Sequence, residues 1–214
     1  MRRSLLLTTL LPFLCGCFPR DQFWQKPDIG QKYTNLTAAA ASAAPVRFIS
    51  LYAQSQPAFP AALYAFPALE RLSLRKTGLL ALPAEIGRLP KLLWLDLGEN
   101  RLQELPASIG DLSALTTLYL SDNRLAALPA EISRLQALRY LNLDRNALTA
   151  LPPQIAGCRN LVWLRLSENK LAALPQELQG LSNSLQRLYL RGNPLPTNEL
   201  QKIRRWLPKT QLIF

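Results

Sequence analysis

The sequence predicts an α/β solenoid, in which a curved parallel β-sheet forms the concave face and short helical or 3-10 segments form the convex face. One observation is a strict period, because six prolines follow one another at intervals of 23 residues: Pro60, Pro83, Pro106, Pro129, Pro152 and Pro175. Another is that the stretch "LYLSDNRLAALP" at 118–129 recurs one period earlier and one period later with the same leucines and asparagine. Self-similarity at such a period indicates stacked structural repeats, so we predict one array rather than several domains.

The array is expected to extend over residues 46–214 and to hold about seven units. Aligned on their first leucine, the later units run 69–91, 92–114, 115–137, 138–160, 161–184 and from 185 onward. Residues 46–68 fit the same frame as a degenerate first unit, with Gln54 in the place of the usual asparagine. We expect a C-terminal cap at about 194–214.

Each unit begins with a short strand. In the pattern "LxxLxLxxN", the leucines at positions four and six lie on one side of an extended segment, because strand side chains alternate between faces. The residues at positions three and five must then point the other way. We therefore expect Tyr119 outside the core and Leu118 and Leu120 inside it.

Position nine of each unit carries an asparagine. A buried amide can donate to and accept from backbone groups of adjacent turns, so we predict a ladder of hydrogen bonds along the array. Thr77 and Gln54 weaken this ladder at its front. The predicted ladder residues are Asn100, Asn123, Asn146, Asn169 and Asn193.

A Leu-Pro pair opens the returning half of each unit, where proline has no amide hydrogen to leave unpaired. An isoleucine three residues later closes the core, and segments such as "AEIGRL" predict short helical pieces. At the C-terminus we expect a helix at 198–206 and a final short strand at 211–214.

These patterns resemble the leucine-rich repeat family, specifically its 23-residue class with "LPxxIxxL". The resemblance covers 46–214, and five consecutive units match nearly every position of the pattern. It implies a curved stack with the strands on the concave side. The family's members are chiefly protein-binding scaffolds, so the resemblance implies a fold and leaves the ligand open.

The first residues, "MRRSLLLTTLLPFLCGC", have the layout of a secretory signal peptide, with basic residues followed by a short apolar run. The end of this stretch resembles the bacterial lipobox, which implies a signal peptide at 1–16 and a lipidated Cys17. Phe18 in place of aspartate then implies the outer membrane of a bacterial cell envelope. An ordinary secretory signal with incidental cysteines is the alternative. Residues 17–45, which have no repeat frame, are expected to form a linker in which the alanine run could be a short helix.

Composition narrows the function further. The formal net charge is +11, but the basic residues are scattered and accompany no nucleic-acid motif, so we expect a solvated surface and no nucleic-acid partner. The absence of histidine excludes an imidazole base or ligand. Cys158 occupies a leucine position, where a buried thiol is expected. We find no phosphate-binding loop, metal-ligand cluster or nucleophile–base pair, and predict no cofactor, no metal site and no enzyme activity.

Aromatic residues and arginines gather at the outward positions three and five, which suggests a binding face. These residue types are enriched at binding hot spots. The alternative is that these side chains only stabilise the sheet by cross-strand packing. The candidate ligand-binding residues are Arg71, Trp94, Asp96, Tyr119, Tyr140, Asn142, Trp163, Arg165, Arg187 and Tyr189. Small residues at position seven, such as Gly98 and Ser121, should leave the neighbouring aromatics accessible in a shallow groove.

We therefore expect a membrane-anchored interaction module, monomeric, that holds a protein or peptide on its concave face. A glycan that stacks on the aromatics is one alternative ligand. A structural role in the envelope without a specific ligand is another.

Overall fold

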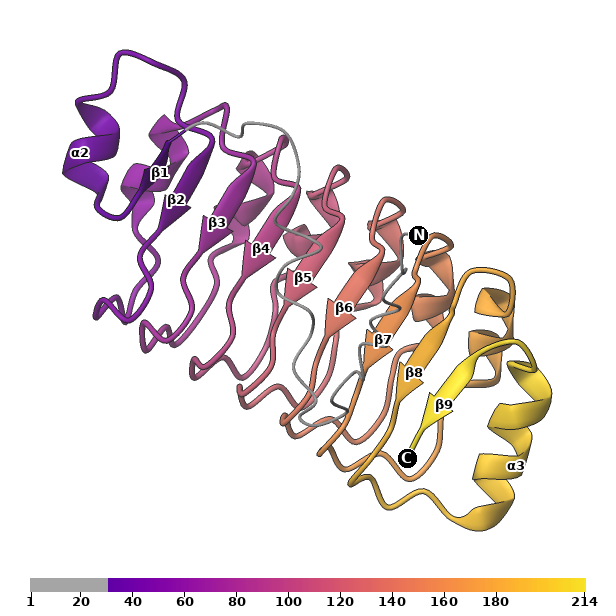
Figure 1. The fold of residues 1–214 in the computed structure, drawn as a ribbon. Helices are drawn as coiled ribbons and strands as arrows, with labels where there is room; N and C mark the ends of the chain where they lie inside the picture. Colours follow the sequence, from indigo (N-terminus) through magenta and orange to yellow (C-terminus); the bar gives the residue numbers. More distant parts are fainter. Residues whose placement is uncertain (1–30) are drawn as a thin grey trace, which may run out of the picture.

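The computed structural model describes residues 31–214, which form one parallel β-sheet whose strands follow the chain order. Each strand is two or three residues long, and the 3-10 helices lie on the opposite side of the stack (Figure 1). This is the predicted α/β solenoid. The strands are β1 (Lys32–Tyr33), β2 (Phe48–Ser50), β3 (Arg71–Ser73), β4 (Trp94–Asp96), β5 (Thr117–Tyr119), β6 (Tyr140–Asn142), β7 (Trp163–Arg165), β8 (Arg187–Tyr189) and β9 (Gln211–Ile213).

The returning half of each unit is a short 3-10 helix that begins after the proline that recurs every 23 residues. A 3-10 helix is narrower than an α-helix, and adjacent ones pack closely: a Cβ at Gly110 would collide with the backbone of Glu131. The 3-10 helices are η1 (Ala61–Ala65), η2 (Ala84–Arg88), η3 (Ala107–Asp111), η4 (Ala130–Arg134), η5 (Pro153–Gly157) and η6 (Gln176–Leu181). In the described residues, no helix is long and apolar enough to cross a membrane.

The leucines of successive units form one continuous core between the strands and the 3-10 helices. Leu95, Leu118 and Leu141, at position four, are at most 1% exposed, and each pairs in register with the next. Burying a leucine side chain stabilises the fold by about 2 kcal/mol. Cys158 lies in this core, where its Sγ donates to the carbonyl of Ile132 and burial raises the pKa of the thiol to about 12.

The array begins earlier than expected. Residues 31–45, which were expected to belong to a linker, form β1 and the short helix α2 (Leu36–Ala40). The helix includes the start of the alanine run, where a short helix was expected. β1 pairs with β2, and Tyr33 and Ala39 are buried against the first unit. The physical reason is that the apolar edge of the first unit needs a cover, and a cap does not repeat, so periodicity does not reveal it. Residues 1–30, including the predicted signal peptide and Cys17, lie outside the described residues.

At the other end, α3 (Thr197–Trp206) and β9 cap the core close to their predicted positions. Ile203 and Leu207 are buried, and Glu199 accepts a hydrogen bond from the backbone of Leu174. The hydrophobic core is therefore capped at both ends of the described chain.

Candidate ligand-binding face

The predicted binding residues lie on the sheet face that points away from the 3-10 helices, which we call the exposed sheet face. Strand register aligns positions three and five into two columns across β2 to β8. Trp94, Tyr119 and Trp163 are partly exposed, whereas the leucines beside them in the chain are fully buried. The structure thus places the aromatic residues outside the core, as the alternation predicts.

In the front half of this face, aromatic rings contact one another. The rings of Phe48 and Trp94 meet edge to face with centroids 6.4 Å apart, and those of Trp94 and Tyr119 with centroids 5.8 Å apart. Such pairs contribute about 1 kcal/mol beyond the area they bury. Burial, followed by the charge of Asp96, raises the pKa of Tyr119 to about 12, so its hydroxyl stays protonated at neutral pH.

In the back half, arginines lie over the rings. Tyr140 and Trp163 meet edge to face at 5.3 Å, and the guanidinium of Arg187 lies 4.7 Å from the centroid of Trp163. Arg165 lies at the same distance over Tyr189. Because guanidinium groups stack on aromatic faces without losing their N–H donors, this half presents both apolar and cationic surface.

Two of the predicted contact residues hold turns instead of pointing freely outward. Asp96 is only 8% exposed, because its Oδ1 accepts from the backbone N–H of Gly98 at 2.9 Å and faces Arg75 at 3.8 Å. Burial raises the pKa of Asp96. Asn142 accepts from the N–H of Asp144 in the same way, at 3.0 Å. Both side chains bond two residues ahead, which is the usual Asx-turn contact.

The expected groove at position seven is also filled in the front half. A Cβ at Gly98 would lie 2.5 Å from Nη1 of Arg75, so the arginine of the preceding unit occupies the space that glycine leaves. The same guanidinium bonds Glu99 at 2.5 Å. Sequence reasoning missed this contact because it links side chains of two units.

Asp144 and Arg165 form an ion pair at the edge of this face, with N···O 2.5 Å. Asp144 is 1% exposed, and its other oxygen accepts from the backbone N–H of Ser167 at 2.7 Å. In other units, an acceptor at position five closes this turn, as Asp96 and Asn142 do. Arg165 stands at position five here and has no side-chain acceptor, so the carboxylate of Asp144 closes the turn instead. Arg165 is held in place by this pair and is a positioned cation on the exposed sheet face.

The asparagines at position nine bond the turns of neighbouring units. Asn146 is representative: its Oδ1 accepts from Leu125 N at 3.0 Å, and its Nδ2 donates to the carbonyls of Leu120 and Leu143 at 2.9 and 3.1 Å. The same set of bonds recurs at Asn100, Asn123, Asn169 and Asn193. These residues act in the fold and lie away from the exposed sheet face.

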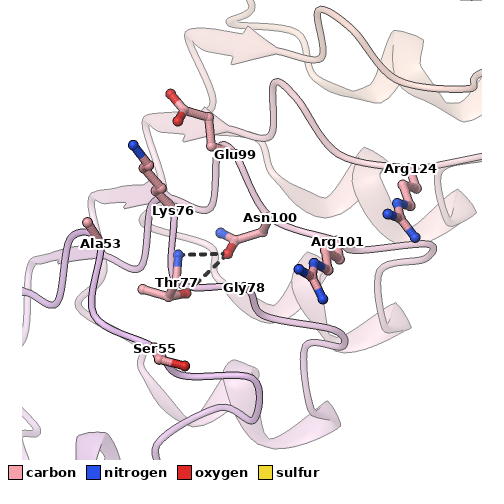
Figure 2. Close-up of a pocket in the computed structure, with 9 residues that line it drawn as sticks. All are labelled: Ala53, Ser55, Lys76, Thr77, Gly78, Glu99, Asn100, Arg101 and Arg124. Carbon is pink, nitrogen blue, oxygen red and sulfur yellow. Dashed lines mark hydrogen bonds between the residues drawn. The ribbon is translucent and has the colours of Figure 1, made fainter.

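A polar pocket, which sequence reasoning did not find, lies beside the turns that follow the first strands (Figure 2). Its lining residues are Ala53, Ser55, Lys76, Thr77, Gly78, Glu99, Asn100, Arg101 and Arg124. The only signal in the sequence is the departure of the first units from the repeat pattern at Gln54 and Thr77. In the described residues, no group of three or more His, Cys, Asp or Glu side chains is placed to hold a metal ion.

Solved structures with similar folds include two with appreciable sequence identity. A leucine-rich repeat protein of Leptospira interrogans is 36% identical over 79% of this chain and 43% of its own, with a TM-score of 0.77. The plant peptide hormone receptor RGFR1, solved in complex with RGF2, is 29% identical over 79% of this chain and 28% of its own, with a TM-score of 0.63.

An internalin of Listeria monocytogenes shares the fold, with a TM-score of 0.68 and 16% identity over 79% of this chain and 47% of its own. The chain therefore spans less than half the length of these three proteins. Among curated proteins, no match was found.

Family models agree with the structural neighbours. The model described as "Leucine rich repeat" matches residues 67–125 and 136–195, which is more than half of the chain. A second model, "Leucine Rich repeats (2 copies)", matches residues 113–156. With its 23-residue period, its parallel sheet and these matches, the chain belongs to the leucine-rich repeat family.

Proposed function

We propose that this protein is a membrane-anchored interaction module that holds an extended protein or peptide segment on the exposed sheet face, and that this face is the concave side of the stack. Proteins of this family commonly act in protein–protein interaction. The observation that carries the proposal is the alignment of aromatic and arginine side chains in two adjacent columns of one sheet. Such residues offer large contact area and fixed hydrogen-bond donors, which is what binding hot spots require.

Charge and geometry favour a segment that carries acidic side chains toward the back half of the face. None of the ion pairs formed within residues 31–214 involves Arg187, although its guanidinium is held 4.7 Å above Trp163. A carboxylate on the ligand would satisfy these donors. The plant receptor RGFR1, a structural neighbour, was solved with a bound hormone, and this supports a peptide or protein as the ligand class.

Selection from a peptide display library tests the proposal. Peptides enriched on the full-length protein should lose at least about tenfold in affinity for the triple variant Trp94→Ala, Tyr140→Ala, Trp163→Ala, because truncating an aromatic hot spot costs about 2 kcal/mol or more. The double variant Leu80→Ala, Leu93→Ala removes exposed apolar side chains elsewhere and is the matched control. Equal binding to the triple variant and the original protein would refute the placement of the site.

A glycan remains the competing ligand class, and the same aromatic residues would serve it by stacking. Free envelope oligosaccharides should not displace the selected peptides from the protein. Displacement by an oligosaccharide, together with the failure of the peptide selection, would assign the face to a glycan. A face that binds neither class would leave a structural role in the envelope.

The proposed anchor is a diacylglycerol on Cys17, in the outer membrane of a bacterial cell envelope. Each buried methylene contributes about 0.8 kcal/mol, so several acyl chains give stable attachment. Mass spectrometry of the native protein should find a lipidated Cys17, and Cys17→Ser should release the protein into the soluble fraction. Recovery of Cys17→Ser in the membrane fraction would contradict lipid anchoring.

A further inference from the structure

The pocket of Figure 2 lies outside the exposed sheet face and has a lining of its own kind. It is open to solvent, has a volume of about 490 Å³, and is bordered by the turns after β2, β3, β4 and β5. Three of its lining residues are small: Ala53, Ser55 and Gly78, which we call the floor of the pocket. No heavy atom lies within 4 Å of the place that a Cβ on Gly78 would take, so the space above this residue is empty of protein.

The side chains around this floor are mainly cationic. Lys76, Arg101 and Arg124 are exposed, and none of the ion pairs within the described part of the chain involves them. The one acid in the lining, Glu99, is bound to Arg75, and Figure 2 shows its carboxylate pointing away from the floor. Three cations that form no ion pair with any of residues 31–214 create a positive potential in the pocket.

A backbone donor adds to these charges. In the next two units, the N–H at position ten donates to a carbonyl of the preceding unit: Arg101 N to Leu79 O at 2.9 Å, and Arg124 N to Leu102 O at 2.8 Å. The corresponding N–H of Gly78 has no acceptor within residues 31–214. Gly78 is partly exposed and lines the pocket, so a ligand oxygen can accept from this N–H.

The cause of this unused donor is the gap in the asparagine ladder. In later units, the N–H at position eleven is held by the side-chain carbonyl of the next asparagine, as for Leu102 and Asn123. Thr77 has no such carbonyl, so Gln56 N bonds the backbone oxygen of Thr77 at 2.8 Å. The carbonyl of Gln56 is then not in place for Gly78, and the first interval of the array differs from all the following ones.

We propose that this pocket binds a phosphate group carried by a small polar molecule. Arginine guanidinium groups bind phosphate with paired N–H donors, and a backbone N–H beside them completes a site for a dianion. The pocket is much larger than a bare phosphate ion, so the ligand is a phosphate monoester such as a phosphorylated sugar or a lipid headgroup. The proposal is independent of the peptide-binding function, because it uses none of the residues of the exposed sheet face.

Calorimetric titration of the full-length protein with glucose 6-phosphate tests the proposal. Saturable binding is expected, and Arg101→Gln, Arg124→Gln together should weaken it at least about tenfold. The control variant Lys170→Gln, Lys209→Gln removes the same amount of charge outside the pocket, and Lys170 stands at position ten of a later unit. The affinity of this control variant for glucose 6-phosphate should change less than about twofold. Equal loss in both variants would overturn the site, and so would the absence of saturable glucose 6-phosphate binding together with the absence of vesicle retention through this pocket.

A second variant tests the backbone donor without changing charge. Thr77→Asn extends the ladder to the front, which should give Gly78 N its acceptor, and it should therefore weaken glucose 6-phosphate binding about threefold or more. Unchanged affinity in Thr77→Asn would show that Gly78 takes no part. Acetate at equal ionic strength should not compete, and competition by acetate as effective as that by phosphate would reject phosphate as the preferred group.

Vesicles distinguish the two sources of the phosphate group. Phosphatidic acid vesicles, whose headgroup is a phosphate monoester, should retain the unlipidated Cys17→Ser protein through this pocket only if a lipid headgroup is the ligand. Adding Arg101→Gln, Arg124→Gln to Cys17→Ser would then abolish retention, while adding the lysine control exchanges would preserve it. If the protein binds glucose 6-phosphate and the vesicles retain the arginine variant and the lysine control equally, the pocket is assigned to a soluble phosphate ester. Failure of both probes rejects the proposal.

Discussion

The front of the array, up to Gly78, and the middle, from β4 to β8, use the same leucine pattern but hold their turns differently. In the middle, each of the turns that follow β4, β5, β6 and β7 receives an asparagine side chain from the next unit. At the front, Gln54 Nε2 donates to Thr34 O at 2.5 Å, and Thr77 Oγ1 donates to Leu74 O at 2.9 Å. The amide of Gln54 and the hydroxyl of Thr77 thus replace only some of the hydrogen bonds that an asparagine makes at this position.

This difference shows that core packing and turn closure are separate requirements. Ile49 and Leu72 are fully buried at the front, as their counterparts are in the middle, so the core does not depend on the asparagines. What the front lacks is hydrogen-bond partners for particular backbone groups, and the N–H of Gly78 finds no acceptor among residues 31–214. A regular repeat hides its polar backbone, whereas an irregular one leaves donors for a ligand.

The largest effect should come from removing a ladder residue in the middle. Asn146→Ala takes away three hydrogen bonds of 3.1 Å or less, so we expect a loss of about 3 kcal/mol in the free energy of unfolding. It leaves the N–H of Leu125 without its acceptor, whereas the carbonyls of Leu120 and Leu143 still accept from Asn123 and Asn169. Thr77→Ala should lose only about 1 kcal/mol. Urea unfolding curves of both variants measure the difference, and equal losses would contradict the contrast between front and middle.

A smaller effect of the opposite sign is expected from Thr77→Asn. The asparagine would bond Gln56 N, Leu51 O and Leu74 O by the geometry that Asn123 and Asn146 use, which should raise the free energy of unfolding by about 1 kcal/mol. Thr77→Val, which has a similar size and no donor, serves as the control and should be destabilising. A thermal melting temperature lower for Thr77→Asn than for the original protein would show that the front turn cannot adopt the middle geometry.

The smallest effect concerns the turn at position five, where β4 has Asp96 and β6 has Asn142. Burial raises the pKa of Asp96, so the folded protein binds this proton more tightly than the unfolded chain does. Stability from this group is present below the ordinary aspartate pKa and is lost as the pH rises through the raised value. Asp96→Asn keeps the acceptor for Gly98 N and should abolish this loss, so its unfolding free energy should fall less between acid and neutral pH.

The converse exchange is the matched control for that measurement. Asn142→Asp places a carboxylate beside the buried Asp144 and should add a loss of stability as the pH rises. Identical pH profiles for Asp96→Asn and the original protein would mean that Arg75 compensates the burial of Asp96 completely.

Several parts of the fold were predictable because they repeat. Alternation placed Leu95 inside and Trp94 outside, and the strands and the C-terminal helix lie within a residue or two of their expected positions. The N-terminal cap, at β1 and α2, occurs only once, so no period indicates it. The burial of Asp96 was also unforeseen, because it depends on a guanidinium that reaches over from the preceding unit.

By itself, the sequence determined the period, the inward leucines, the outward columns and the asparagine ladder, since these follow from side-chain alternation and from the stacking of identical units. Only the tertiary structure decided how each turn is closed. Position eight shows why: Lys76, Glu99, Asp122 and Arg145 all have positive φ, a conformation that costs about 1 kcal/mol in residues other than glycine. Each is held there by an N–H bond to a carbonyl of the next unit, as from Glu99 N to Ser121 O at 2.9 Å. Such a bond exists only after the units have stacked, and so does the unused donor at Gly78.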